Sequence, residues 1–439
     1  MSFFRQSLLT LFSNSGMTLL GLLTGLLLAR TLGPTGRGLM TTVMIWPAVL
    51  VWAAGLSLGY ANIYFAASEP SKRQALFANS FWMAIFLGEA AGVVAAWGLP
   101  KFLHLNSSQH FLLTFSLLLL SVGLFSDYAS SLLQGTGRFD QLALVRMIAP
   151  LVIGVLLMGL WAGHLVTVTS VVVVTWVGSL CQFSCTLYFL GQAGCLSLRP
   201  DHCLLRRSIN YSLRIHPGTL AGLANGRIDQ LLMTALVAPR LLGFYALAVT
   251  FSELSRQLSA SIATVLFSRM AGEVSADARR AMATRATRWT LLIGCAGGLC
   301  LGLAAHPFVA LLWGSRFLEA VPTIYVLLPG TVALGVASSM ASSLNGAGRP
   351  GVTTLAEIAS LLVMIPLLWV LLPRFGILGA GVASTIGYIV NCLVTGKYFA
   401  QTFGPDALRE LRPSQHDWNE MCIIVGRMRM RVQPARGCP

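Results

Sequence analysis

Charged residues are scarce in this chain of 439 residues: Asp, Glu, Lys and Arg make up only 10% of it, whereas hydrophobic residues make up 55%. The mean hydropathy is +0.73. A soluble core does not need so much apolar surface, so the composition excludes most soluble classes and indicates a polytopic membrane protein. The sequence also lacks an HExxH motif, a Walker lysine loop and a GxSxG elbow, so it offers no catalytic residues and no cofactor site.

Metal-ligand clusters are also missing from the sequence. Nine cysteines are present, but the seven histidines are dispersed. Cys181 and Cys185 stand four apart on one helix face without a nearby histidine or carboxylate, which favours packing over a metal site. Four further cysteines fall in segments expected on the cytoplasmic side, where thiols stay reduced. We therefore predict no metal site and no disulfide.

Long hydrophobic stretches are abundant, and twelve are long enough to cross the hydrocarbon layer, which takes about 20 residues each. The stretches lie near residues 8–28, 40–66, 75–97, 111–133, 142–162, 165–190, 211–237, 241–267, 287–310, 321–344, 352–372 and 376–400. The predicted fold class is all-α and integral to the membrane, with twelve transmembrane helices. No small-residue cleavage site follows the first stretch, so we interpret it as a retained span and not as a signal peptide.

A heptapeptide repeat divides these stretches into two sets of six. LQGTGRF at Leu133–Phe139 recurs as LNGAGRP at Leu344–Pro350, and each copy closes the fourth stretch of its set. Gly36 and Gly243 recur at nearly the same offset, as do Gly163 and Gly376. Six crossings return a chain to the side where it started. The two lobes are therefore expected to be related by a pseudo-two-fold axis along the membrane normal, as in parallel-repeat transporters.

The repeat also sets the expected domain organisation. Residues 1–200 form an N-lobe with spans one to six, and residues 201–402 form a C-lobe with spans seven to twelve. Residues 403–439 are basic, punctuated by proline and too polar to span, and we interpret them as a cytoplasmic tail without fixed structure.

The net charge of +15 indicates membrane orientation and not a nucleic-acid partner. With the N-terminus inside, 22 of the 30 Lys and Arg residues fall on the cytoplasmic side and six on the outer side. This asymmetry places both termini in the cytoplasm.

Seven ionisable residues lie within the predicted spans: Glu89, Asp127, Arg227, Asp229, Glu253, Arg256 and Glu357. Each would cost roughly 2.5–3.5 kcal/mol at the centre of the bilayer, so they should face a cavity or one another. Glu253 and Arg256 are three apart on a helix and should form an ion pair. We take Glu89, Asp127, Glu253 and Glu357 as candidates for coupling transport to an ion gradient.

Arg227 is the strongest candidate for contact with a substrate. Residues two positions apart on a helix are separated by about 200° of rotation, so Asp229 should point away from Arg227. A guanidinium stays charged when desolvated and binds oxyanions with two parallel hydrogen bonds. The alternative is an inter-helical ion pair with Glu89 or Asp127. Asp229, Arg30 and Arg37 complete the candidate substrate-binding set.

The same span carries Pro217, Gly218, Gly222 and Gly226. Glycines four apart form a smooth stripe that lets another helix approach closely, and a proline weakens the hydrogen-bond ladder beside it. The stripe predicts close helix packing, or a helix that bends as a cavity opens from one side to the other.

Five segments together resemble the Wzx-type polysaccharide-biosynthesis flippases. They are LLARTLGPTGRGLM (27–40), GLSLGYANIYFAA (55–67), LQGTGRF (133–139), RIDQLLMTALVAPRLLGFYALA (227–248) and RFGILGAGVAS (374–384). Those flippases belong to the MOP superfamily together with the MATE multidrug exporters and the lipid II flippases. The resemblance covers about residues 1–400, and ARxLGPxGxG is its most specific part.

The resemblance implies two six-helix lobes around a central cavity in the bacterial inner membrane. It further implies transfer of an undecaprenyl-pyrophosphate-linked oligosaccharide for O-antigen, capsule or exopolysaccharide synthesis. The partners it implies are this lipid-linked substrate, the bilayer and the machinery that assembles the polysaccharide. A MATE-like cation-coupled drug exporter and a membrane oligosaccharide polymerase or ligase are the alternatives. The sequence does not give the glycan, the coupling ion or the oligomeric state.

Overall fold

The computed structural model is almost entirely helical. It describes residues 3–103, 106–272, 275–347, 349 and 351–411. The helices are α1 (Phe3–Ala54), α2 (Leu58–Ser68), α3 (Arg73–Phe102), α4 (Ser107–Leu118), α5 (Leu120–Gly135), α6 (Phe139–Ala162), α7 (Val168–Gln192), α8 (His202–Leu236), α9 (Pro239–Gly272), α10 (Ala276–Leu312), α11 (Val321–Gly346), α12 (Gly351–Phe403) and α13 (Asp406–Arg409), with short 3-10 turns at Pro70–Lys72 and Ser315–Ala320. The all-α prediction is confirmed.

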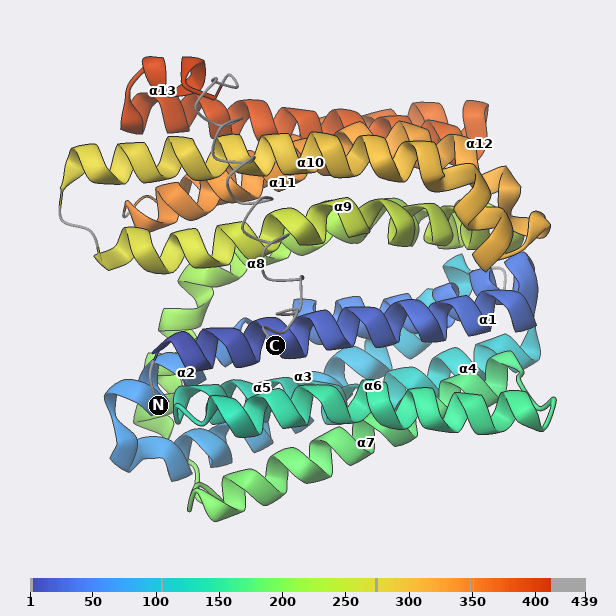
Figure 1. Ribbon diagram of the computed structural model, residues 1–439. Helices are drawn as coiled ribbons and strands as arrows, with labels where there is room; N and C mark the ends of the chain where they lie inside the picture. Colours follow the sequence, from blue (N-terminus) through green and yellow to red (C-terminus); the bar gives the residue numbers. More distant parts are fainter. Residues whose placement is uncertain (1–2, 104–105, 273–274, 348, 350, 412–439) are drawn as a thin grey trace, which may run out of the picture.

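The helices pack as two groups with separate hydrophobic cores. Figure 1 shows α1–α7 in one group and α9–α12 in the other, with α8 passing between them. The core of the first group is built from buried residues between Leu58 and Leu204. The core of the second runs from Met233 to Ala383; from the first group, Ala29 is buried in it and Leu26 packs against it. The two groups can therefore each keep their packing if they move relative to one another.

Two of the helices each contain two of the predicted spans. Gly33 interrupts α1 with a φ of 68°, and Gly376 interrupts α12 with a φ of 56°. A straight helix of 53 residues, the length of α12, would extend about 80 Å, far more than the roughly 30 Å of a hydrocarbon layer. Glycine adopts positive φ without the strain of a side chain, so it permits these breaks.

The predicted span 40–66 is broken where the sequence analysis expected one helix. α1 ends at Ala54 and α2 begins at Leu58, and the backbone at Leu56 and Ser57 has positive φ. The Tyr128 hydroxyl on α5 donates to the carbonyl oxygen of Gly55 at 2.8 Å. A hydroxyl from a distant helix thus satisfies a polar backbone group at the break, and no local sequence signal reveals it.

Eight helical stretches of the described chain are long and apolar enough to cross a membrane. Each of the long helices α1 and α12 supplies one of them. α8 and α9 are not in this set, although both were predicted as spans. They carry Arg227, Asp229, Glu253 and Arg256, which lower their mean hydropathy. The protein is a multi-pass membrane protein, and α8 and α9 lie where the two groups meet.

The two groups touch through bare backbone at one end of the molecule, which we call the crossing end (residues 33–38 and 239–243). A Cβ atom added at Gly38 would overlap the carbonyl oxygen of Pro239, and one at Gly243 would overlap that of Pro34. The contact partner of Gly243 is therefore Gly38, two residues beyond the Gly36 of the predicted repeat. Only glycine at both positions permits this reciprocal approach.

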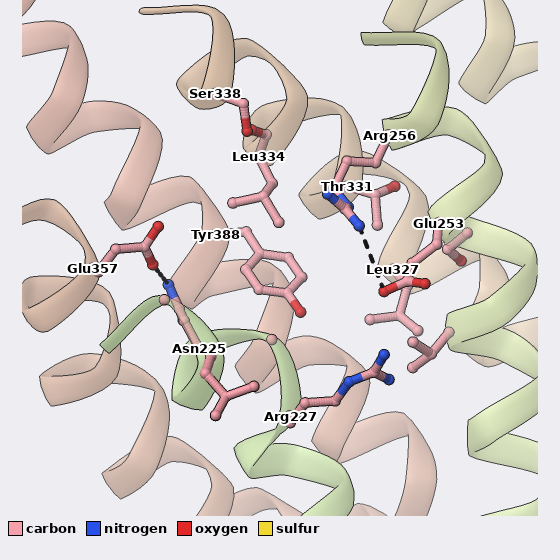
Figure 2. A pocket seen from close by; sticks show the side chains of 15 residues that line it. Asn225, Arg227, Glu253, Arg256, Leu327, Thr331, Leu334, Ser338, Glu357 and Tyr388 are labelled. Atoms are coloured by element: carbon pink, nitrogen blue, oxygen red, sulfur yellow. Dashed lines mark hydrogen bonds and ion pairs between the residues drawn. The ribbon is translucent and has the colours of Figure 1, made fainter. Parts of the chain in front are cut away.

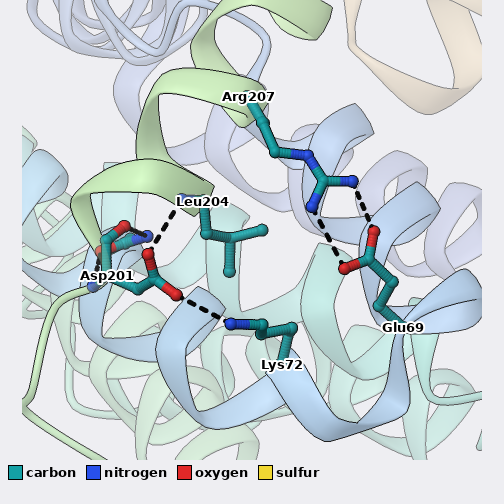
Figure 3. A network of polar contacts seen from close by, with 6 residues as sticks. Glu69, Lys72, Asp201, Leu204 and Arg207 are labelled. Atoms are coloured by element: carbon teal, nitrogen blue, oxygen red, sulfur yellow. Dashed lines mark hydrogen bonds and ion pairs between the residues drawn. The ribbon is translucent and has the colours of Figure 1, made fainter.

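At the opposite end, the start of α8 is fixed to the first group (Figure 3). The Asp201 side chain caps α8 through the backbone N–H of Leu204 and accepts from the Lys72 ammonium, each at 3.0 Å. Arg207 pairs with Glu69 at 2.6 Å. The cap and Lys72 lower the pKa of the Asp201 carboxyl, and the Glu69 carboxylate raises the pKa of Arg207.

The predicted tail is partly ordered. Residues 404–411 include α13, and Glu410 accepts from Arg280 of α10 at 2.6 Å. Residues 412–439 lie outside the described part of the chain.

Candidate functional site

A cavity of about 290 Å³ lies among four helices around the second core. Its walls are residues 222–227 of α8, 249–256 of α9, 327–338 of α11, and Glu357 and Tyr388 of α12. Figure 2 shows side chains from these helices converging on the same space. The cavity therefore gathers residues from both halves of the broken helix α12.

Two glycines of the α8 stripe, Gly222 and Gly226, leave open space in the cavity wall because they have no side chains. A Cβ atom at Gly226 would meet nothing within 4 Å, and at Gly222 the nearest atom would be Glu357 Cδ at 4.0 Å. Gly218 differs, because a Cβ there would press on the Thr354 hydroxyl of α12. Close packing thus holds at Gly218, whereas Gly222 and Gly226 leave room for a ligand. α8 stays helical across Pro217.

Arg227 lines this cavity, and Figure 2 shows its guanidinium pointing into it. Among the described residues, no carboxylate lies within ion-pair distance of Arg227. Neither Glu89 nor Asp127, the partners considered from the sequence, is one of the cavity-lining residues. The guanidinium is left with hydrogen-bond donors available to an anion.

Asp229 is separated from the cavity, although it was grouped with Arg227 from the sequence. It is only 1% exposed. Its Oδ2 accepts from the Tyr245 hydroxyl at 2.5 Å and from the Ser384 hydroxyl at 3.1 Å. These bonds join α8 to α9 and α12, so Asp229 holds helices together and does not face the cavity.

Glu253 and Arg256 of α9 form the predicted ion pair, with Nη2 and Oε1 3.9 Å apart. Both line the cavity. The distance is too long for a hydrogen bond, and the two side chains keep about a third of their surface exposed. The pair therefore leaves both groups able to contact a ligand.

Glu357 lies across the cavity and is held by a residue that the sequence analysis missed. Asn225 of α8 donates to Glu357 Oε2 at 2.5 Å, and its own Oδ1 is 2.9 Å from the Ser360 hydroxyl. Asn225 is 2% exposed. An asparagine two residues before a candidate arginine, in an apolar span, was the available signal.

The remaining candidates lie elsewhere. Arg30 bonds to the carbonyl oxygens of Leu311 and Leu312. It therefore satisfies the C-terminal carbonyls of α10 and links the two groups near the crossing end, away from the cavity. The Arg37 guanidinium lies beside Gly25. Glu89 accepts from the Ser121 hydroxyl at 2.8 Å, and Asp127 is exposed on α5.

Among the described residues, no group of three or more His, Cys, Asp or Glu side chains could hold a metal ion. The charged groups that line the cavity are two guanidinium groups, Arg227 and Arg256, and two carboxylates, Glu253 and Glu357.

Known proteins agree with this architecture. A MATE-family multidrug resistance transporter of the MOP superfamily in an inward-facing conformation matches with a TM-score of 0.76 at 14% identity, over 89% of this chain and 95% of that one. The lipid II flippase MurJ matches at 0.71 and 16% identity, over 97% and 96%. A Methanocaldococcus jannaschii membrane protein, MJ1068, is 24% identical over 193 residues, 43% of this chain but only 38% of that relative.

These structures establish the shared fold. The family model described as polysaccharide biosynthesis protein matches residues 27–322, which is more than half of the sequence. It covers the crossing end, α8 and the α9 wall of the cavity. The chain therefore belongs to the polysaccharide biosynthesis protein family, which confirms the family resemblance inferred from the sequence.

Proposed function

We propose that this protein moves a lipid-linked oligosaccharide, carried on undecaprenyl pyrophosphate, across the bacterial inner membrane by alternating access. The observation that carries the proposal is the cavity-facing Arg227 without a carboxylate partner in the described chain. A planar guanidinium that stays charged in an apolar site matches the oxygens of a phosphate group. The product serves O-antigen, capsule or exopolysaccharide synthesis, and the polysaccharide assembly machinery is the expected partner.

The size of the cavity limits what it can hold. About 290 Å³ accommodates a phosphate headgroup and not a whole glycan. The glycan would therefore extend between the two groups of helices while the pyrophosphate stays near Arg227.

The proposed membrane arrangement has twelve spans in two six-helix lobes. It counts the two halves of α1 and of α12 separately and includes α8 and α9. The lobes correspond to residues 1–200 and 201–402, and both termini are cytoplasmic. In this orientation the crossing end faces outward, and the Asp201 network lies on the cytoplasmic side.

Coupling to a proton or sodium gradient completes the proposal. Glu253 and Glu357 are supported as coupling groups because both line the cavity. Glu89 and Asp127 remain candidates outside it. If transport in vesicles is indifferent to collapse of both gradients, the coupling proposal is wrong.

The substrate is tested by mass analysis of lipid-linked oligosaccharides in a strain that lacks this protein. Undecaprenyl-linked glycan should accumulate on the inner leaflet and disappear when the gene is restored. Absence of accumulation, together with dye efflux by the purified protein in vesicles, would favour a multidrug exporter instead.

A further inference from the structure

The Ser360 hydroxyl of α12 lies between two acceptors. Its Oγ is 2.9 Å from Asn225 Oδ1 on α8 and 2.7 Å from the carbonyl oxygen of Gly387 on the second half of α12. A serine hydroxyl has one proton and cannot donate to both oxygens at once. Ser360 is fully buried, so its proton must be directed to one of these two partners.

The direction of the Ser360 proton is linked to the charge on Glu357 through the Asn225 amide. An amide donates from one end and accepts at the other. When Asn225 donates to Glu357, its amide oxygen faces Ser360 and accepts a hydrogen bond from the serine hydroxyl. This arrangement requires Glu357 to be an acceptor, as an ionised carboxylate is.

Protonation of Glu357 allows the order of donors to reverse. When the pH is lowered and a proton from the bulk solution adds to a carboxylate oxygen, Glu357 can donate to Asn225. The amide then rotates, with its oxygen toward Glu357 and its nitrogen toward Ser360. The serine proton must turn to the Gly387 carbonyl, because the serine oxygen now accepts from the amide.

We propose that Glu357, Asn225 and Ser360 form a hydrogen-bond relay that transmits the protonation of a cavity carboxylate to the backbone of α12 at Gly387. The relay rests on the proposed coupling role of Glu357. It connects α8 with both halves of α12 across the break at Gly376. A Cβ atom at Gly387 would lie 3.0 Å from Met364 Cβ and 3.2 Å from Ser360 Oγ, so no water separates the relay from the backbone it reaches.

Other charged or titratable groups face the same cavity. They are Arg227 of α8, Glu253 and Arg256 of α9, and Tyr388 of α12, whereas α11 contributes none. Tyr388 follows Gly387 directly in the chain. A change at the Gly387 carbonyl is therefore adjacent to a side chain that lines the ligand cavity.

The relay can be observed without measuring transport. The dipeptide Gly-Tyr occurs only at Gly59–Tyr60 and Gly387–Tyr388. In full-length protein in bilayers, ¹³C-carbonyl glycine combined with ¹⁵N-tyrosine therefore selects two carbonyl signals by magnetic resonance. As the pH is lowered, we expect the Gly387 signal to shift with Glu357. The Gly59 signal reports instead on Asp127, whose carboxylate lies beside Gly59, so it should be unchanged by substitutions of Glu357 or Ser360. ¹⁵N-labelled asparagine, assigned by loss of one signal in Asn225→Leu, should show the Asn225 amide shifting at the same midpoint as the Gly387 signal.

Three variants separate the steps of the relay. Glu357→Gln should keep the Gly387 carbonyl signal and the Asn225 amide signal fixed at every pH. Ser360→Ala should leave the Asn225 shift intact and abolish the Gly387 shift. Ser338→Ala is the matched control, because this cavity-lining serine bonds to Leu334 of its own helix, and both shifts should persist in it.

Several results would overturn the relay: a Gly387 signal that stays fixed in the unaltered protein, one that still shifts in Ser360→Ala, or one that follows sodium at constant pH. Intact shifts in a protein that fails to clear lipid-linked glycan would overturn the proposed function and leave the relay standing. Export of lipid-linked glycan without these shifts would overturn the relay and leave the proposed function standing.

Discussion

In the proposed mechanism, Arg227 is the residue expected to bind the anionic group of the substrate. Arg227→Ala should insert at normal levels and lose roughly tenfold to a hundredfold in export, because a charge-assisted hydrogen bond contributes about 1.5–3 kcal/mol. Arg227→Lys keeps the charge without the bidentate fork and should retain part of the activity. Membrane abundance and glycan export, measured in the same cells, check both expectations.

A structural role for Arg227 predicts the opposite pattern. If it neutralised Glu253 or Glu357 through the cavity, Arg227→Ala would strand a buried carboxylate at a cost of several kcal/mol and reduce the amount of folded protein. Adding Glu357→Gln or Glu253→Gln would then restore both abundance and export. Full rescue by either double variant would remove Arg227 from the substrate ligands.

Asp201 provides a prediction about pH. Its carboxyl has a lowered pKa in the folded protein, so its charge stabilises the fold above the pKa of about 3.9 of an unfolded aspartate, and this contribution is lost as the pH falls through the folded value. Asp201→Asn keeps a good helix cap but removes the negative charge that pairs with Lys72. It should lower the thermal midpoint at neutral pH, and this difference should shrink as the pH is lowered below about 3.9, which thermal unfolding in detergent would show. A difference that stays constant as the pH is lowered would contradict this account.

The sequence predicted one contact at the cavity, the Glu253–Arg256 ion pair, because that contact is local. The pair Glu253–Arg256 follows from a spacing of three on one helix. The partners of Asp229 do not, since Tyr245 and Ser384 come from two other helices. Asn225 was missed for the same reason, because an amide gains its role only when α12 brings Glu357 and Ser360 beside it.

At the scale of elements, the crossing of Gly38 and Gly243 should be intolerant of any side chain. Gly38→Val or Gly243→Val places carbon atoms on a carbonyl oxygen of the other group and should hold the crossing end apart. A cysteine at Ala29, which is 2% exposed between the groups, should then react with an impermeant maleimide. Gly98→Val is the matched control, since a Cβ at Gly98 meets nothing within 4 Å. Unchanged labelling in the Gly38 and Gly243 variants would show that the crossing does not close this end.

Helix positions were predicted well where hydrophobicity alone sets them, as in α6, α7 and α11. The divisions of α1 at Gly33 and of α12 at Gly376 also fall between predicted spans or at the edge of one. The break at Leu56 and Ser57 was not predicted. It is associated with a hydrogen bond to Gly55 from Tyr128, seventy-three residues away. Such breaks depend on tertiary contacts that a periodic apolar pattern does not contain.

For the whole molecule, the orientation in the membrane is the most direct prediction. Alkaline phosphatase fused after Lys101 or Arg316 should be active, because these residues are expected outside, and fused after Arg207 or Arg285 it should be inactive. Equal expression of the fusions is the control. The reverse pattern of activity would invert the proposed orientation.

Helix α8 belongs to both groups of helices, so the boundary between the groups lies within α8 and not at the loop that precedes it. Its first turns are bound to one group of helices through Asp201 and Arg207, and His216 adds a contact to Ser57 at 3.1 Å. Its last turns belong to the other group through Asn225 and Met233. Two fragments separated between Leu198 and Arg199 would still share that interface and should reassemble when they are expressed together. Fragments separated at Pro217 would each contain half of α8. A movement of one group could then no longer be transmitted to the other through this helix.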